Sequence, residues 1–361
     1  MENKVEDREV LLKVENLCQY FRLGRFAVNK AVDNVSFDIK KGEVFGLVGE
    51  SGCGKTTTGR AIIKLYDLTS GNVYFKGQRI SAGFKSYKDE IAKARKEFKT
   101  CTDEERKAEL EKTIRENKEQ IREARLCNKN VDRKLVNQIQ MIFQDPIASL
   151  DPRMTVRDII AEGLVIKGIK DKDYIDNKVY EMLETVGLVR EHASRYPHEF
   201  SGGQRQRIGV ARAVIMEPSL IIADEPISAL DVSIRAQIMN LLNDLRQKMG
   251  LTILFIAHDL SVVKYFSDRI GVMYYGHMVE LADSEELFRH PLHPYTRSLL
   301  SAIPQPDPRY ERNRKRIVYN PVADHDYRNS TPTFREVCPG HFVLCDDAEF
   351  EKYTKIVSGQ V

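Results

Sequence analysis

One stretch, Gly49–Thr57, constrains the fold of this chain more than any other. It reads Gly-Glu-Ser-Gly-Cys-Gly-Lys-Thr-Thr and fits G-x-x-x-x-G-K-[ST], the pattern of a phosphate-binding P-loop. The apolar run Val44–Val48 before it predicts a buried parallel strand, and the proline-free residues 58–65 after it can form a helix. Strand, glycine-rich loop and helix start are the context in which this motif binds phosphate.

The residue types in the loop predict how a nucleoside triphosphate would be held. Glycines let successive backbone N–H groups converge on a phosphate, and the following helix N-terminus adds about half a positive charge. Lys55 can reach the β- and γ-phosphates, and the Thr56 hydroxyl can ligate Mg²⁺. We therefore expect ATP to be bound by the whole loop, namely Gly49, Glu50, Ser51, Gly52, Cys53, Gly54, Lys55, Thr56 and Thr57.

Length and composition limit the class of protein. The 361 residues are too many for one small domain, and 30% charged with 42% hydrophobic residues suits a globular protein with a proper core. A net charge of +3 gives no argument for a nucleic-acid partner, and none is expected. Residues 1–7 lack the apolar stretch of a signal peptide, and no run approaches the ~20 apolar residues of a membrane span. Six scattered cysteines fit a reducing cytoplasm rather than a disulfide framework.

Short apolar runs alternate with longer segments of helical character along most of the chain. This alternation predicts an α/β fold with a mainly parallel sheet. Strands are expected at 10–14, 35–39, 44–48, 71–77, 139–144, 220–223 and 251–257. Helices are expected at 156–165, 174–186, 206–216, 233–249, 284–289 and 295–302. A proline-rich link, 304–308, leads to a tail that reads as a small domain.

Residues 84–137 differ in character from the rest of the chain. Lys, Arg and Glu dominate, and neither Gly nor Pro occurs from Lys85 to Asn137. The pattern predicts two antiparallel helices broken near 100–103, with Thr102 as a candidate cap of the second helix. Two interpretations stay open: a solvated charged hairpin inserted into the main domain, or an arm that docks a partner.

Polar side chains stand at the ends of three of the expected strands. Asp224 ends an apolar strand, where a carboxylate can hold Mg²⁺, and Glu225 beside it can act as general base on a water molecule. Gln144 can sense the γ-phosphate, metal or water, and His258 can contact the γ-phosphate. The carboxyl ends of parallel strands share one sheet edge, where α/β folds bind ligands. An aromatic residue before the P-loop strand, Phe21, can stack on adenine or serve as a core residue.

A second anion site is predicted at Ser201, Gly202, Gly203 and Gln204. These residues open a helix without supplying a lysine. One P-loop fold needs one phosphate cradle, so the second cradle must serve another nucleotide. The physical solution is a head-to-tail dimer in which each P-loop faces the other chain's Ser-Gly-Gly-Gln.

With these motifs in order, the sequence resembles the ATP-binding subunits of ABC transporters. The resemblance implies a P-loop NTPase ABC ATPase domain over 8–283, a helical subdomain over about 145–215 and a C-terminal region over 284–361. Mg²⁺ would be held by Thr56, Gln144 and Asp224. The motifs are Walker A (Gly49–Thr57), Q-loop (Gln144), signature (Ser201–Gln204, after Phe200 where Leu is common), Walker B (Leu220–Glu225), D-loop (Ser228-Ala229-Leu230-Asp231) and H-loop (His258).

Within that family, three stretches resemble the F-type subunits of oligopeptide/dipeptide permeases. They are Asp145–Arg153, His290–Thr296 and Pro339–Val343. This resemblance implies a paralogous ATPase partner in a heterodimer, two membrane permease subunits, an extracellular solute-binding protein acting indirectly, and a place on the cytoplasmic face of the membrane. Many such relatives end with four cysteines of iron–sulfur type, of which this tail has only Cys338 and Cys345.

Three functions stay open at this point. The first is the motor ATPase of an oligopeptide importer. The second is the ATPase of an importer of nickel or another small solute, which shares the same tail. The third is a soluble ABC ATPase that acts on ribosomes or DNA, although such proteins commonly carry two cassettes.

Overall fold

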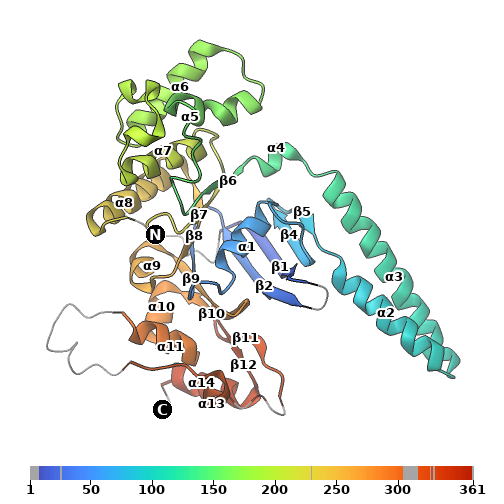
Figure 1. Cartoon of the computed structure of the whole chain (residues 1–361). Helices are drawn as coiled ribbons and strands as arrows, with labels where there is room; N and C mark the ends of the chain where they lie inside the picture. The colour runs from blue at the N-terminus through green and yellow to red at the C-terminus, as the bar shows by residue number, and fades with distance from the viewer. Residues whose placement is uncertain are drawn as a thin grey trace. The chain divides into compact units, whose positions relative to one another are not determined.

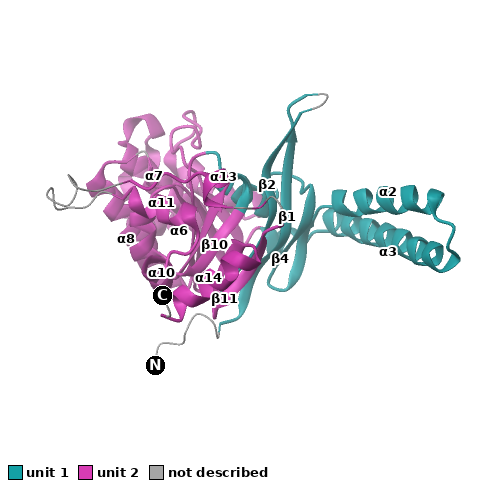
Figure 2. Cartoon of the chain, turned by 90° about the horizontal axis from the view of Figure 1, so that it is seen from below, with its two compact units in different colours: residues 1–40, 52–136, 275–277 teal, residues 41–51, 137–274, 278–361 magenta. Residues whose placement is uncertain are grey.

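The computed structural model describes residues 8–24, 27–228, 230–303, 316–325, 327 and 330–359. The chain divides into two compact units, shown in teal and magenta in Figure 2. Unit 1 holds residues 1–40, 52–136 and 275–277, and unit 2 holds 41–51, 137–274 and 278–361. The division falls inside the P-loop, between Ser51 and Gly52. Among the described residues, no helix is both long and apolar enough to cross a membrane.

Unit 1 is built on a four-stranded sheet of order β2-β1-β4-β5, whose neighbouring strands all pair antiparallel. The strand expected at 35–39 is confirmed as part of β2, and its Val35, Phe37 and Ile39 side chains are buried. β5 was not predicted, since its short sequence begins with two polar residues and lacks a clear alternation. The elements are β1 (Val10–Arg22), β2 (Val28–Lys40), α1 (Lys55–Ile62), β4 (Ser70–Phe75) and β5 (Gln78–Ala82).

The charged segment forms the predicted helical hairpin, α2 (Lys85–Thr100) and α3 (Glu104–Lys129), followed by α4 (Arg133–Val136). The two long helices run side by side (Figures 1 and 2). The predicted cap at Thr102 is wrong: α3 begins one residue later than that cap requires. Asp103 is the capping residue, and its carboxylate accepts the Glu105 N–H at 3.1 Å.

The root of this hairpin is fastened to the sheet of unit 1. The Asn128 amide bonds both backbone groups of Ala82, accepting from its N–H at 3.1 Å and donating to its carbonyl at 2.8 Å. The Cys127 thiol donates to the Arg79 carbonyl at 3.1 Å. The end of α3 therefore occupies backbone groups of β5 that an edge strand would otherwise expose to other chains.

Unit 2 is built on an eight-stranded sheet of order β11-β12-β10-β9-β3-β8-β7-β6. The run β9-β3-β8-β7-β6 is parallel, which confirms the predicted parallel sheet. β3, β7 and β8 are buried at every position, as expected for strands covered on both faces. The strands are β3 (Val44–Val48), β6 (Ile139–Ile142), β7 (Leu220–Asp224), β8 (Thr252–Ala257), β9 (Arg269–Tyr274), β10 (His277–Asp283), β11 (Thr333–Cys338) and β12 (His341–Cys345).

The helices of unit 2 begin and end at residues that suit those positions. Thr155 and Asp171 accept backbone N–H groups as caps of α5 and α6, and Gly250 ends α8 in the left-handed conformation at φ 65°. The helices are α5 (Val156–Ile166), α6 (Lys172–Thr185), η2 (Arg190–Ser194), η3 (Pro197–Glu199), α7 (Gly202–Val214), α8 (Val232–Met249), α9 (Leu260–Phe266), α10 (Ser284–Arg289), α11 (Pro294–Ser301), α13 (Pro321–Asp324) and α14 (Asp347–Val357).

The C-terminal strands extend the main sheet of unit 2. β12 pairs antiparallel with β10, with Glu280 opposite Val343, and β11 pairs antiparallel with β12. The tail therefore shares its sheet with the strands that precede it in the chain. The proline-rich link lies outside the described residues.

Candidate functional site

The P-loop has the backbone that its glycines predict. Gly52 and Gly54 lie at φ 83° and 107°, a region that side-chain-bearing residues rarely adopt, and Gly54 is the N-cap of α1. Lys55 opens that helix; its side chain is buried and its Nζ lies 3.7 Å from the Cys53 sulfur. Burial raises the pKa of the Cys53 thiol, although Lys55 acts in the opposite direction. Cys53 is therefore a neutral packing group of the loop at neutral pH.

The part of the loop that belongs to unit 2 is held by a residue that the sequence did not single out. The Glu50 N–H donates to the Tyr295 hydroxyl at 3.0 Å. Tyr295 is buried at the start of α11, and its ring lies 4.5 Å from that of Tyr274, centroid to centroid. The only sequence signal was its place in the run His290–Thr296, which resembles peptide permeases.

The predicted convergence of strand ends is confirmed within unit 2. β3, β8, β7 and β6 are consecutive parallel neighbours, so Gly49, His258, Glu225 and Gln144 follow strands that end at one edge. The Glu225 carboxylate lies between the other two side chains. Its Oε2 accepts from Gln144 Nε2 at 3.1 Å and lies 3.1 Å from His258 Nδ1.

The backbone at Glu225 has an uncommon conformation that neighbouring residues hold by hydrogen bonds. Its φ is 44°, uncommon for a residue with a side chain, and its N–H donates to the Ile256 carbonyl at 3.0 Å. Its carbonyl accepts both the N–H and the hydroxyl of Ser228, at 3.2 and 3.1 Å. Strained residues of this kind cluster at functional sites because the surroundings hold them there. Asp224, which precedes it, ends β7 with no exposed surface.

Gln144, Glu225 and His258, here called the strand-end group, have the chemistry of a proton acceptor. An ionised carboxylate only accepts hydrogen bonds, and here an amide and an imidazole orient it. The Glu225 side chain keeps 12% of its surface exposed and His258 keeps 50%, so both are accessible to a small ligand from solution.

The Ser-Gly-Gly-Gln stretch forms the predicted helix start: α7 begins at Gly202, four residues before the start expected at 206. Ser201 caps α7: its hydroxyl accepts the Gln204 N–H at 3.3 Å, and the Gln204 side chain accepts the Ser201 N–H at 3.1 Å. The first N–H groups of a helix have no partner within it and suit an anion. A Cβ on Gly203 would come within 2.7 Å of Ile234 of α8, so this glycine permits close packing of the two helices.

The structure also describes Phe21 and Asp231, two further predicted residues. Phe21 lies in β1 of unit 1, and its ring packs edge to face on Tyr66 with centroids 5.3 Å apart. Its adenine contact stays a prediction. Asp231, the last D-loop residue, is exposed and precedes α8, while Ala229 lies outside the described residues.

Comparisons with known proteins identify the family. A model of the ABC transporter family matches residues 32–137 and 120–228, and a model of the oligopeptide/dipeptide transporter C-terminal region matches 279–344. The chain is 55% identical to the oligopeptide transport ATP-binding protein OppF of Bacillus subtilis (strain 168), covering 96% of this chain and 99% of that one. The chain belongs to the ABC transporter family. As the ATPase subunit of such a transporter, it binds and hydrolyses ATP.

Further relatives agree with this membership. The dipeptide transport ATP-binding protein DppF of Lactococcus lactis subsp. cremoris (strain MG1363) is 49% identical, with 96% of this ABC ATPase and 97% of that protein covered. Among solved structures, the dimeric bacterial ABC transporter cassette MJ0796 matches with a TM-score of 0.57 at 25% identity, covering 76% of this chain and 99% of that one. The cassette cbiO1 of Clostridium perfringens matches in fold with a TM-score of 0.57 at 24% identity, covering 79% of this chain and 92% of that one.

Proposed function

We propose that this ABC ATPase is one of two unlike motor subunits of an oligopeptide importer and works at the cytoplasmic face of the membrane. The observation that carries the proposal is the match of residues 279–344 to the oligopeptide/dipeptide C-terminal region, together with two near-full-length relatives named for oligopeptide and dipeptide transport. The nickel importer, which shares this tail, has no comparable support among these relatives.

The proposed nucleotide site assigns ATP to the residues of the P-loop and Mg²⁺ to Thr56, Gln144 and Asp224. The donor set fits that ion, because a hydroxyl, an amide oxygen and a carboxylate are the oxygen ligands that Mg²⁺ takes beside water and phosphate. Gln144 uses its Nε2 on Glu225, which leaves the amide oxygen for the metal. When bound, Mg²⁺ offsets the charge on the β- and γ-phosphates.

The proposed catalytic residues are Glu225 and His258. Glu225 would accept the proton of the attacking water, a role supported by its position between Gln144 and His258 with both groups 3.1 Å away. His258 would hold the carboxylate and contact the γ-phosphate. A positioned general base is worth roughly 10²–10⁴ in rate.

The proposed oligomer is a heterodimer with a paralogous ATPase. The chain supplies one P-loop and one signature helix start, so each of two composite sites would use the P-loop of one chain and Ser201–Gln204 of the other. Asp231 would lie at the same interface. The matched MJ0796 cassette is dimeric, which supports two cassettes working together.

The proposed contact with the permease lies in the segment 145–165. Apolar side chains are exposed along and just beyond it, with Ile147 65% exposed and Ile166 76% exposed, and exposed apolar surface commonly marks a docking site. The segment is joined to the interior of unit 2, since Arg212 donates to the Ser149 carbonyl at 2.6 Å. Gln144, just before it, bonds Glu225 and so connects this segment to the proposed base.

Purification of the intact complex from membranes tests the proposed function. We expect this chain to co-purify with a second, different ATPase and two permeases, and peptide delivered by the binding protein to stimulate ATP hydrolysis. The isolated chain at low concentration should be a weak ATPase. Stimulation by nickel rather than peptide, or co-purification with ribosomes, would contradict the proposal.

A further inference from the structure

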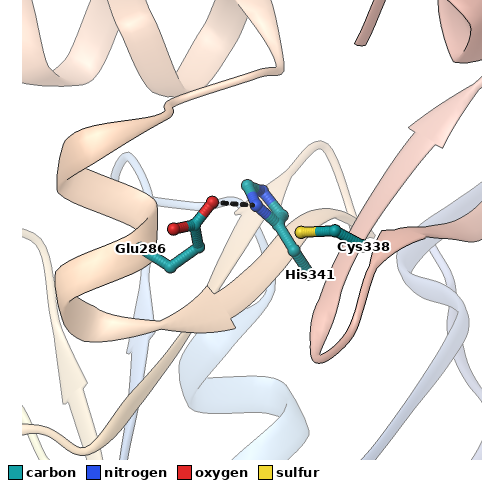
Figure 3. A group of neighbouring side chains, drawn as sticks. All are labelled: Glu286, Cys338 and His341. Carbon is teal, nitrogen blue, oxygen red and sulfur yellow. Dashed lines mark hydrogen bonds and ion pairs between the residues drawn. The ribbon is translucent and has the colours of Figure 1, made fainter. Parts of the chain in front are cut away.

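Three side chains of different chemistry meet in the C-terminal part of unit 2. Glu286 reaches from α10 toward Cys338, which ends β11, and His341, which begins β12 (Figure 3). The carboxylate oxygen, the thiol sulfur and the imidazole nitrogen all lie within 4.8 Å of one another. Glu286 Oε1 is 3.4 Å from His341 Nδ1.

The turn between β11 and β12 sets two of the three positions. Pro339 and Gly340 connect the strands, and Gly340 lies at φ 77°, where a side chain would be strained. The Gly340 N–H donates to Glu336 Oε1 at 2.9 Å and closes the turn. Cys338 and His341 are thereby held on either side of a short, ordered connection.

A contact of the other ring nitrogen, Nε2, with Glu280 fixes the orientation of the His341 side chain. Nε2 lies 2.9 Å from Oε1 of Glu280, and neither side chain has exposed surface. Glu280 also accepts the N–H groups of Leu292 and His293, at 2.7 and 3.1 Å. Because an ionised carboxylate only accepts, Nε2 donates a hydrogen to Glu280, and Nδ1 is the nitrogen that faces Glu286. A carboxylate that holds the far nitrogen of a histidine is the usual support of a metal-ligating imidazole.

We propose that Glu286, Cys338 and His341 bind a thiophilic transition-metal ion, with Zn²⁺ as the best fit. Zinc takes Cys, His and Glu together, whereas Mg²⁺ and Ca²⁺ avoid sulfur. Bonds of about 2.0–2.3 Å in a tetrahedron place ligand atoms roughly 3.3–3.8 Å apart. The three atoms lie within 4.8 Å of one another, so a pair at that limit would have to close by roughly 1–1.5 Å. After these three residues, the nearest further candidate ligand is His290, whose Nδ1 lies 3.0 Å from Glu286 Oε1.

The donor set differs from that of an iron–sulfur cluster, which typically requires four thiolates. Only one thiol belongs to the group. Cys345, the next described cysteine, packs instead against Leu292, Val343 and Tyr353 in a small apolar cluster. A single bound ion would join α10 to the β11–β12 hairpin and stabilise the tail by mass action.

Cobalt titration of the chelator-stripped full chain tests this site. Co²⁺ should bind with one-to-one stoichiometry and give the near-ultraviolet charge-transfer absorption of a thiolate–metal bond, and one equivalent of Zn²⁺ should displace it. Cys338→Ser should abolish that absorption and weaken Zn²⁺ binding by roughly tenfold or more. Cys101→Ser, between the helices of the charged hairpin, is the matched control and should change neither.

A second readout separates ligation from a structural role. Zn²⁺ should raise the thermal unfolding midpoint of the unmodified chain and of Cys101→Ser, but not that of Cys338→Ser. Glu286→Gln should weaken Co²⁺ binding while keeping the thiolate absorption. Failure to bind stoichiometric Co²⁺, or a thiolate absorption that survives in Cys338→Ser, would overturn the proposal. In that case Glu286 only accepts hydrogen bonds from the two imidazoles.

Discussion

Two groups on the same eight-stranded sheet contain a glutamate beside a histidine, yet they differ in access and in what holds them. In the strand-end group, Glu225 and His258 keep 12% and 50% of their side-chain surface exposed and follow parallel strands. In the tail group, Glu280 and His341 have none exposed and lie on antiparallel strands. The strand-end group is therefore the open group, and its access suits a ligand that enters and leaves. The tail group is the closed group, and its burial suits a permanent structural contact.

Breaking the closed group should produce the largest change in stability. Glu280→Ala removes the acceptor for two buried N–H groups and for His341, so the free energy of unfolding should fall by about 3–5 kcal/mol. Urea unfolding in the presence of a chelator measures this change without any contribution from metal.

Two control variants test whether this loss of stability is particular to the closed group. Glu285→Ala, exposed on α10, should cost less than about 0.5 kcal/mol, and His258→Ala in the open group less than about 1 kcal/mol. Equal losses for Glu280→Ala and His258→Ala would show that the two groups do not differ as described.

His293, whose N–H donates to Glu280 of the closed group, should also make the stability of the chain depend on pH. Burial lowers the pKa of His293 to about 3, with His325 and Arg297 acting in the same direction, and its neutral Nδ1 accepts the Tyr295 N–H at 3.1 Å. The unfolded chain takes up this proton near pH 6.5, so it binds more protons than the folded chain between about pH 6.5 and about pH 3. Stability from this group is complete above that window and falls as the pH is lowered through it.

The slope of unfolding free energy against pH measures this contribution, which is at most about 1.4 kcal/mol per pH unit. His293→Asn keeps a capping acceptor but removes the titrating group, so its slope between about pH 6.5 and about pH 4 should be shallower. His198→Asn, at an exposed histidine, should keep the slope of the unmodified chain. Identical slopes for His293→Asn and the unmodified chain would refute the assignment.

The smallest expected effect concerns the contact between the tail helix α11 and the P-loop. Tyr295→Phe removes the acceptor of the Glu50 N–H, a hydrogen bond of about 1 kcal/mol, so ATP affinity should fall by roughly fivefold with little change in turnover at saturating ATP. Tyr319→Phe is the matched control, because it removes a hydroxyl from the same aromatic cluster that bonds His325 instead. A larger loss of ATP affinity in Tyr319→Phe would mean that the hydroxyl of Tyr295 does not position the loop.

The sequence could predict the open group but not the closed one. Gln144, Glu225 and His258 each follow an apolar strand, and parallel pairing brings such ends to one edge without any knowledge of side-chain contacts. Glu280 and His341 lie on β10 and β12, which pair antiparallel although they are distant in the chain, and Glu286 lies on helix α10. No regular sequence spacing connects these three residues.

Local signals predicted the helices more reliably than the long-range contacts. The hairpin at 84–137 followed from composition, the lack of Gly and Pro and the spacing of its few apolar residues, and the error at its cap amounts to one residue, Asp103 in place of Thr102. The bond between Glu50 and Tyr295 joins residues 245 positions apart, and no pattern in either segment indicates it. The tail reads in the sequence only as a small domain, and its strands β11 and β12 were not predicted. They join the main sheet by pairing between distant segments, which depends on burial that only the folded chain defines.

The most direct test of the account is the comparison of Glu225→Gln with Lys55→Ala in the complete transporter. Glu225→Gln keeps the size of the side chain but removes the base, so hydrolysis should fall by roughly 10²–10⁴ while ATP affinity stays nearly unchanged. Lys55→Ala should instead lose ATP binding at its own site. ATP binding and turnover are measured on each variant, together with the amount of closed heterodimer that retains ATP. Accumulation of the closed, ATP-bound heterodimer in Glu225→Gln alone is the predicted result. Near-normal turnover in Glu225→Gln, with its site shown to be occupied, would contradict the catalytic role of the strand-end group.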